Sequence, residues 1–423
     1  MCHLPFPRVT NEPSSVLLAG FDLWPGSSGW SRRMAEAVGA TAHRHPVLTF
    51  SIRAPSLPHT EFLLGARALR VPPGSGGLLD QVETFGRAVQ RQLDAEPPGL
   101  VHTADPLVGA AVLAHPRRPI LLYEARRLPS SELPLLCARG QEAQVLEPAL
   151  RRWERHCVLE AHGVVVTTRA RADEVRALGR KGPLHLVPDG VEPADLRPPG
   201  SAPLRIRHVG WDLSVGALRI LLAMVREAGP EIRLHLVQPR GAPWASSLQR
   251  EVSAAARTGA LTVGRPGALP AGWAEVELLP GIDPESAAPA VLADALEGFA
   301  RGCTALAADS DAARADLPAG CTVFFPRGDA QALAAAVRTL AGAPDLLGQS
   351  AAEARSYVVR RHDAARVRGL LRDLYRRHGV VHAAGRTSPR PSMPAAPPPW
   401  SGSSPGGRAV ESTDPGTPTG RFG

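Results

Sequence analysis

The chain has 423 residues, 44% of them hydrophobic and 4% aromatic, and it carries 48 basic against 40 acidic side chains. This length predicts two domains, and the hydrophobic content excludes disorder throughout. No apolar run reaches the roughly 20 residues of a membrane-spanning helix, and the N-terminus lacks the apolar core of a signal peptide, so we expect a cytoplasmic protein. The five scattered cysteines argue against a disulfide framework or a zinc site. The formal charge of +8 suits a polyanion, an acidic membrane or a phosphorylated ligand.

Apolar β-rich runs alternate with helical patterns along the chain. The predicted strands of the first half are Val16–Ala19, Val47–Ile52, Leu100–Thr103, Ile120–Tyr123, Val164–Thr167 and Leu184–Val187. Those of the second half are Leu204–Val209, Ile232–Val237, Val276–Leu279, Thr304–Ala307 and Thr322–Phe325. The predicted helices include Leu79–Ala95, Pro148–Ala161, Ala170–Leu178, Val215–Glu227, Ala290–Arg301 and Ala330–Ala341. This alternation, with several strands apolar throughout, predicts parallel sheets that are covered by helices on both faces.

A stretch rich in proline and small residues, Glu192–Pro203, separates the two series of elements and is the predicted interdomain linker. We therefore expect two doubly wound α/β domains, residues 1–197 and 198–380, that face one another across a cleft. Residues 381–423 are rich in Pro, Gly and Ser and have little apolar surface to bury, which predicts a disordered tail.

Candidate site residues are sought beyond the carboxyl ends of the strands, because open parallel sheets bind their ligands there. The small residues of Pro25–Gly29 follow the first strand and precede a helix. Gly26 and Gly29 would let backbone N–H groups approach an anion or a sugar. The same composition also suits an ordinary loop, and it matches neither a dinucleotide fingerprint nor a P-loop.

Polar residues also follow two later strands of the first half. His102 lies near the end of its strand, where it is suited to hydrogen-bond a ligand hydroxyl, to act as a base, or to serve as a structural hydrogen-bonder. Glu124 and Arg126 come directly after the next strand. They form either part of a site or a solvated charged loop.

The segment from Asp283 to Asp309 holds three carboxylates of interest, Glu285, Asp294 and Glu297. Asp294 and Glu297 are three residues apart on a predicted helix and therefore lie near one face. Carboxylates there could accept hydrogen bonds from sugar or ribose hydroxyls. Glu297 is followed by Gly298 and by Gly302, a glycine suited to close packing, which argues against a surface position without a role, whereas Asp294 also suits a solvated helix surface.

Six segments together resemble a known family, the nucleotide-sugar-dependent glycosyltransferases of GT-B architecture, family 4 in particular. The resemblance extends over about residues 14–378 and depends on the order and spacing of the segments. The matching segments are Ile120–Arg127, Glu154 with Ala161–Thr168, Leu186–Glu192 (LVPDGVE), Leu296–Gly302 (LEGFARG), Phe325–Val337 and Leu371–Tyr375.

The resemblance implies transfer of a sugar from a nucleotide donor to an acceptor hydroxyl, with retention, no essential metal and no cofactor besides the donor itself. The donor is expected mostly on the second domain, with Glu297 at its ribose. Gly210 and Arg265 are further donor-site candidates, and the acceptor is expected in the loops of the first domain. The expected partners are a nucleotide sugar and a carbohydrate or lipid-linked acceptor.

Two positions depart from the family pattern. Where the family has a glutamate that contacts the donor sugar, this chain has Pro289, and Glu285 would substitute only in a longer loop. The family's diphosphate-binding arginine and lysine are missing from Gly210–Gly216. Losing such a contact typically costs several kcal/mol of transition-state stabilisation. The candidates for the missing charge are Arg207, Arg219 and Arg265.

The departures leave a second hypothesis open: a catalytically inactive GT-B scaffold that acts as a partner subunit or binds carbohydrate. Binding of nucleic acid is not expected, because the basic residues lie along helices without interleaved aromatics or a recognised motif. These arginine stripes are either solvated faces or a surface for peripheral contact with anionic lipid at the inner face of the membrane.

Overall fold

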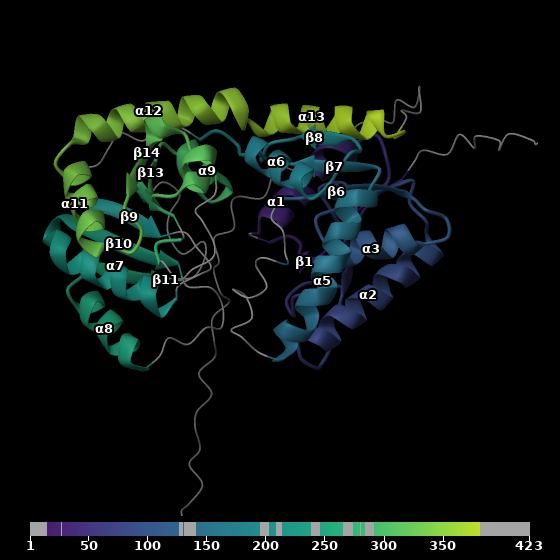
Figure 1. The fold of residues 1–423 in the computed structure, drawn as a ribbon, viewed down its shortest axis with the longest axis horizontal. Helices are drawn as coiled ribbons and strands as arrows, with labels where there is room; N and C mark the ends of the chain where they lie inside the picture. The colour runs from purple at the N-terminus through teal and green to yellow at the C-terminus, as the bar shows by residue number, and fades with distance from the viewer. Residues whose placement is uncertain are drawn as a thin grey trace, which may run out of the picture. The chain divides into compact units, whose positions relative to one another are not determined.

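The computed structural model describes residues 15–26, 28–126, 130, 141–194, 203–208, 214–237, 246–264, 274–279, 281–283 and 292–380. Of residues 141–143, 237, 246–248 and 294 it describes only the backbone. The predicted tail, 381–423, lies outside the described residues, as does most of the predicted linker. The described chain forms two α/β domains, each built on a largely parallel sheet, as predicted (Figure 1).

The first sheet has its strands in the order β3-β4-β2-β1-β5-β6-β7-β8. They are β1 Val16–Leu23, β2 Val47–Ile52, β3 Thr60–Leu63, β4 Ala66–Val71, β5 Leu100–Thr103, β6 Ile120–Glu124, β7 Gly163–Val166 and β8 Leu184–Leu186. Neighbouring strands run parallel except β3, which pairs antiparallel with β4 at the edge. The strand order reverses between β1 and β5. Open α/β sheets bind ligands at such switch points.

Helices cover both faces of the first sheet. Those described here are α1 Gly29–Thr41, α2 Leu78–Ala95, α3 Pro106–Ala114, α5 Gln141–Glu160 and α6 Arg169–Ala177. The side chains of Ser28, Asp105 and Thr168 cap α1, α3 and α6 by accepting hydrogen bonds from first-turn N–H groups. Two separate clusters of buried apolar side chains, one including α1 and the other including α2, α3 and α5, bury the sheet from its two sides.

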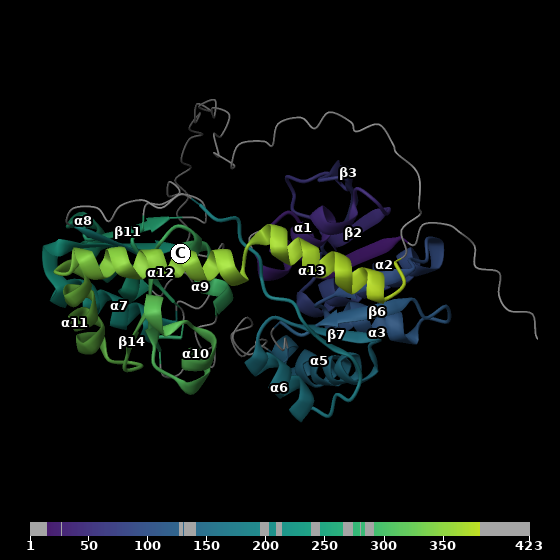
Figure 2. The same ribbon diagram turned by 90° about the horizontal axis from the view of Figure 1, so that it is seen from above.

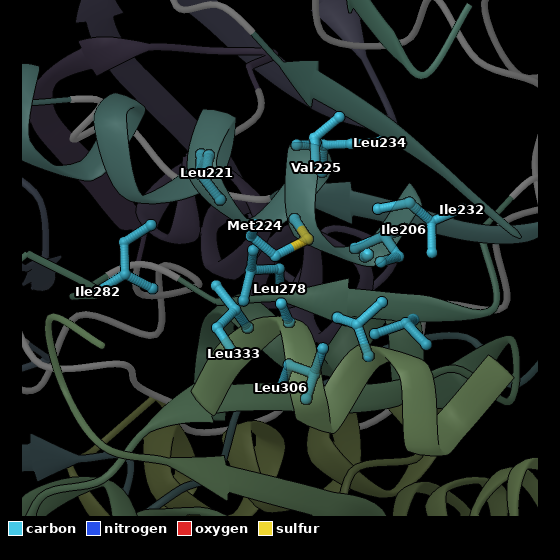
Figure 3. Packing of buried hydrophobic residues seen from close by; sticks show 14 of the residues in the cluster. Ile206, Leu221, Met224, Val225, Ile232, Leu234, Leu278, Ile282, Leu306 and Leu333 are labelled. Atoms are coloured by element: carbon cyan, nitrogen blue, oxygen red, sulfur yellow. The ribbon is translucent and has the colours of Figure 1, made fainter. Parts of the chain in front are cut away.

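The second sheet is parallel throughout, in the order β11-β10-β9-β12-β13-β14. Its strands are β9 Leu204–His208, β10 Ile232–Val237, β11 Leu261–Gly264, β12 Val276–Leu278, β13 Thr304–Ala308 and β14 Thr322–Phe325. The accompanying helices are α7 Val215–Ala228, α8 Ser246–Arg257, α9 Leu292–Ala300, α10 Asp311–Asp316, α11 Ala330–Ala341 and α12 Pro344–Arg361. Met224 of α7 packs over Ile206 and Leu278 of the central strands (Figure 3). The switch point of this sheet lies between β9 and β12.

The last helix of the described residues, α13 Ala364–Arg377, returns to the first sheet. Val367 and Leu371 of α13 belong to the same buried cluster as α1, and the two helices lie side by side (Figure 2). The chain segments that lead out of the first sheet and back to it pair through a parallel bridge between Val191 and Asp363. The division at residues 197 and 198 stays a prediction. The structure adds that a helix far beyond this division in sequence completes the core of the first domain.

Candidate functional site

Both sheets place polar side chains at their switch points, where two neighbouring strands diverge into their loops. The strands concerned are β1 and β5 in the first sheet and β9 and β12 in the second. Helices α1, α3, α7 and α9 begin beyond the carboxyl ends of strands. Their first-turn N–H groups have no partner within the helix, so each start favours an anion or a capping side chain.

The loop between β1 and α1 is shaped by glycines. The Gly26 N–H donates to Ser31 Oγ at 2.7 Å, and Ser28 caps α1 by accepting from the Ser31 N–H at 2.9 Å. A Cβ at Gly29 would lie 2.8 Å from Nη2 of Arg126, so the absence of a side chain lets this guanidinium approach the start of α1. The structure thus brings together Gly29 and Arg126, which the sequence had proposed independently.

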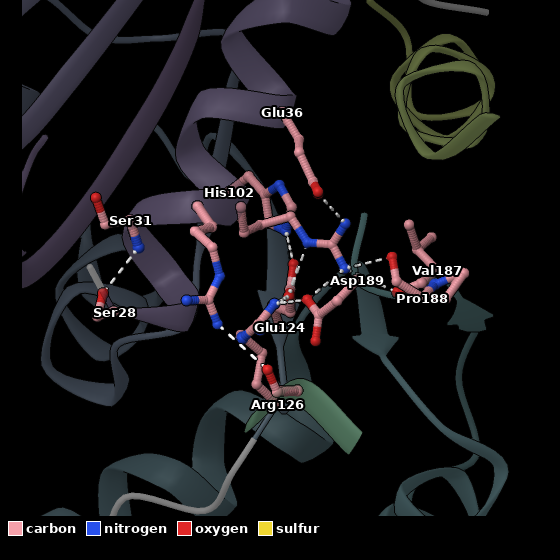
Figure 4. A network of polar contacts seen from close by, with 12 residues as sticks. Ser28, Ser31, Glu36, His102, Glu124, Arg126, Val187, Pro188 and Asp189 are labelled. Atoms are coloured by element: carbon pink, nitrogen blue, oxygen red, sulfur yellow. Dashed lines mark hydrogen bonds and ion pairs between the residues drawn. The ribbon is translucent and has the colours of Figure 1, made fainter. Parts of the chain in front are cut away.

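Arg33 of α1 is the centre of a buried ionic network. Figure 4 shows its partners Glu36 and Glu124. Arg33 Nε donates to Glu124 Oε1 at 3.0 Å, and Nη1 donates to Glu36 Oε2 at 2.9 Å. Arg33 Nη2 donates to the carbonyl oxygens of Val187 and Pro188 at 2.8 and 3.1 Å. A guanidinium without solvent contact requires such complete pairing, because an unpaired buried charge is strongly destabilising. Arg33 therefore ties α1 to β6 and to the segment that follows β8.

Glu124 ends β6 and is fully buried, with cations on two sides. Burial by itself raises a carboxyl pKa, but Arg33, His102 and Arg126 together outweigh it and lower the pKa of Glu124 well below its usual range. Arg126 Nη1 donates to Glu124 Oε1 at 2.9 Å and also pairs with Asp189. Glu124 is therefore an ionised carboxylate that holds Arg126 in position beside α1.

Glu36 behaves in the opposite way. The pKa of Glu36 is raised to about 7. Burial is the main cause and the negative charge of Asp189 adds to it, while the positive charge of Arg33 opposes the rise. A Cβ at Gly190 would collide with the Glu36 carboxyl, so the chain passes directly over this group. The Glu36 carboxyl therefore titrates near neutral pH. It lies beside Gly190, in the segment that leads out of the first domain.

His102 lies inside this network, without solvent exposure. Its Nε2 is 3.1 Å from Glu124 Oε2, and its Nδ1 is 2.7 Å from the Tyr375 hydroxyl of α13. Because a carboxylate only accepts, Nε2 carries the proton, and Nδ1 accepts from Tyr375. The structure thus places His102 in the structural hydrogen-bonding role that the sequence left open. A catalytic contact with substrate stays a prediction.

Glu297, the predicted ribose-binding residue, lies on α9 with its side chain 41% exposed. Its Oε1 is 3.5 Å from Nη1 of Arg32 of α1, and its Oε2 is 3.8 Å from Nη1 of Arg301. Arg207 of β9 donates through Nε and Nη2 to Glu277 at 3.0 and 2.6 Å. Arg207 was a sequence candidate for diphosphate charge, but the structure engages it with Glu277 on the adjacent strand.

At the switch point of the second sheet, a carboxylate sits against the start of α7. Ser214 caps α7 by accepting from the Ala217 N–H at 2.9 Å, and its hydroxyl donates to Asp283 Oδ2. A Cβ at Gly216 would collide with the Asp283 carboxylate. A negative charge is favourable at a helix start. Here Asp283 of the protein supplies the negative charge. It lies in the part of the sheet where the family that the sequence resembles has a diphosphate-binding lysine, which this chain lacks.

Three predicted site residues, Glu285, Gly210 and Arg265, lie outside the described residues. Asp294 lies in α9, where only its backbone is described. The roles assigned to these residues stay predictions. Within the described ranges, no three His, Cys, Asp or Glu side chains are grouped as a metal site would require. Across the same ranges no helix has both the length and the apolar character to cross a bilayer.

Reasoning from the sequence missed Arg32, Arg33 and Glu36. All three lie in one amphipathic helix, α1, that the sequence marked only by its preceding loop. Arginine is too frequent in this chain for a single one to stand out, because 47 of the 48 basic residues are arginine. The one available signal was a charged cluster on the helix that follows the candidate loop.

Residues 28–190 match the family model of the glycosyl transferase 4-like domain. No curated protein matches the sequence. Among solved structures, sucrose-phosphate synthase from Thermosynechococcus elongatus is similar with a TM-score of 0.69 at 18% identity, covering 86% of this chain and 98% of that chain. HepE of Anabaena, in complex with UDP and glucose, has a TM-score of 0.63 at 15% identity over 86% and 100%.

WaaG, a glycosyltransferase involved in lipopolysaccharide biosynthesis, has a TM-score of 0.60 at 14% identity, covering 85% of this chain and 99% of that chain. At these identities the structures establish the fold, and the family model matches part of the first domain. Both agree with the resemblance that the sequence motifs indicated. The described chain therefore has the GT-B fold of two α/β domains, and residues 28–190 match the glycosyl transferase 4-like domain.

Proposed function

We propose that this protein is a glycosyltransferase that transfers a sugar from a nucleotide-sugar donor to an acceptor hydroxyl, with retention of configuration and without an essential metal. The observation that carries this proposal is the half-exposed carboxylate of Glu297 on α9, in a GT-B fold. HepE, a protein of the same fold, is described in complex with UDP and with UDP-glucose.

We assign the roles of the side chains from the family resemblance together with their charges and positions. Glu297 accepts hydrogen bonds from the ribose hydroxyls of the donor, which requires an ionised carboxylate with solvent access. The β1–α1 loop receives the acceptor or the transferred sugar at Gly29, while the Gly26 N–H, bound to Ser31 Oγ, fixes the shape of the loop. Arg126 stands beside this loop, fixed by Glu124 and Asp189. Glu285, outside the described residues, is the proposed contact to the donor sugar.

The test is incubation with a panel of UDP-, GDP-, ADP- and dTDP-sugars, measuring nucleotide release and the shift of the melting temperature with each donor. We expect release with at least one donor, and a loss of release in Glu297→Ala. An exposed carboxylate on α11's cap, Asp329, gives the control Asp329→Asn, which should keep activity. If the folded protein releases no nucleotide and shows no shift of its melting temperature with any donor, the proposal is refuted.

A second function has a specific observation in its favour. The Asp283 carboxylate occupies the start of α7, and Arg207 is engaged by Glu277, so the described part of the second sheet offers little free positive charge at its switch point. This favours a catalytically inactive scaffold that serves as a partner subunit or binds carbohydrate. Turnover that depends on Glu297 would exclude this alternative.

We also propose peripheral contact with anionic membranes. Arg151, Arg152 and Arg155 are exposed on α5, and such clusters gain about 1 kcal/mol per residue near an anionic surface. Flotation with vesicles of phosphatidylcholine alone or with added phosphatidylserine tests this contact. Equal recovery with both kinds of vesicle would contradict it.

A further inference from the structure

Arg32 of α1 reaches from the first domain to α9 of the second. Its Nη1 lies 3.5 Å from Glu297 Oε1, and its Nη2 donates to the Ala293 carbonyl oxygen at 3.5 Å. Ala293 and Glu297 belong to the first two turns of α9. The side chains of Arg32 and Glu297 are 37% and 41% exposed. One guanidinium therefore stands at the start of α9, against the carboxylate proposed to bind the donor ribose.

The described side chains around Glu297 carry more positive than negative charge. Nη1 of Arg301 is 3.8 Å from Oε2 of Glu297, and Arg207 forms an ion pair with Glu277. Burial opposes ionisation of Arg207, but Glu277 and, more weakly, Glu297 raise its pKa. Among the side chains that the structure describes, the group thus comprises three arginines and two carboxylates, a net charge of one positive. Such a group attracts an anion that approaches the exposed edge formed by Arg32 and Glu297.

The Arg32–Glu297 pair is also easy to exchange. An exposed ion pair at this distance contributes little to the stability of the fold, because solvent screens it. A guanidinium bound to phosphate makes two parallel charge-assisted hydrogen bonds, which are roughly twice as strong as neutral ones. A phosphate can therefore replace Glu297 as the partner of Arg32 at small cost. The same exchange leaves the Glu297 oxygens available to accept from hydroxyl groups.

We propose that Arg32 binds the diphosphate of the nucleotide-sugar donor and supplies, from α1 of the first domain, the positive charge that the segment 210–216 lacks. This inference rests on the proposed function, because it assigns a residue to the donor site of that reaction. Arg32 lies in the first turn of α1, whose start favours negative charge, and the Arg126 guanidinium approaches that start at Gly29. Glu297 is the partner of Arg32 that the diphosphate would replace.

The test compares wild type with Arg32→Gln by isothermal titration calorimetry. The probes are UDP, GDP, ADP and dTDP, each titrated beside its parent nucleoside. We expect wild type to bind one diphosphate more tightly than its nucleoside, and Arg32→Gln to weaken that diphosphate about ten-fold while binding the nucleoside unchanged. Arg32→Lys, which keeps the charge but not the paired hydrogen bonds, should recover part of the loss.

The control variant is Arg176→Gln, which breaks another exposed ion pair, with Asp173 on α6, far along the chain from the site. It should bind every probe like wild type. Equal affinity of Arg32→Gln and wild type for the diphosphate would overturn the inference and leave the proposed function standing. Equal weakening of diphosphate and nucleoside would also overturn it, because Arg32 would then act on the shape of the site. Absence of binding in wild type would overturn both proposals.

Discussion

The Tyr375 hydroxyl lies 2.7 Å from His102 Nδ1, although the two residues are 273 positions apart. Tyr375 comes from α13 and His102 from a central strand of the first sheet. Through His102 the contact continues to Glu124, and from Glu124 to the guanidinium of Arg126 beside the β1–α1 loop. Helix α13 therefore helps to order the candidate acceptor side of the site.

We predict that Tyr375→Phe destabilises the protein. The substitution keeps the buried ring but leaves His102 Nδ1 without a donor, and an unsatisfied buried group costs about 1–3 kcal/mol. Urea unfolding measures the loss. Tyr357→Phe is the matched control, because the Tyr357 hydroxyl is 3.4 Å from His362 Nε2, too long for a strong hydrogen bond. A loss no larger than that of the control would contradict the buried hydrogen bond.

Arg33→Met should be among the most damaging substitutions in the first domain. It removes the common partner of Glu124 and Glu36 and breaks two buried ion pairs, and the loss of one partner of a buried pair costs about 3–5 kcal/mol. Chemical unfolding of Arg33→Met and of the exposed control Arg151→Met, whose partner is Glu147, gives the comparison. The control should change stability by about 0.5 kcal/mol or less.

A double-mutant cycle separates the charge effect from lost packing. If Arg33 and Glu124 interact as the geometry indicates, the double variant Arg33→Met with Glu124→Gln loses less stability than the sum of the single variants. Additive losses would mean that the two side chains stabilise the protein independently.

Glu36 predicts a specific dependence of stability on pH. Its pKa in the folded protein is about 7, above the ordinary 4.5, so between these values the folded state binds more protons than the unfolded state. The stabilising contribution is therefore complete below pH 4.5 and is lost as the pH rises through 7. In Glu36→Gln, which cannot ionise, stability should fall less between pH 5 and 8 than in wild type, by about 1–3 kcal/mol. Thermal unfolding at several pH values checks this, and parallel curves would refute it.

Gly298→Ala should strain the second domain. A Cβ at Gly298 would collide with Cγ of Glu277, and this side chain is buried and fixed by its two hydrogen bonds to Arg207. Overpacking of this kind costs about 1–3 kcal/mol. Gly320→Ala is the control, because its nearest neighbour there is Glu353 at 3.7 Å, an ordinary contact. Equal melting temperatures of the two variants would show that α9 shifts without cost.

The local sequence was sufficient to predict much of the secondary structure, because strands and helices follow from the period of apolar residues. The strands Val47–Ile52, Leu100–Thr103 and Thr322–Phe325 and the helix Ala330–Ala341 have the predicted bounds. The strands β3 and β4 were not predicted. In β4, Ala66–Val71, Arg67 and Arg70 interrupt the apolar residues, so the continuous apolar signal of a buried strand is absent.

The sequence by itself therefore determined two series of alternating elements, the position of the β1–α1 loop and Glu297 as a candidate, since each depends on a short pattern along the chain. Only the tertiary structure decided which of 47 arginines matter. Arg32 and Arg33 are adjacent on α1, yet Arg33 is fully buried among carboxylates, whereas the side chain of Arg32 is 37% exposed and paired with Glu297. The reason is physical: burial and charge pairing are set by which elements pack together, and α1 meets β6, α9 and α13 from distant parts of the sequence.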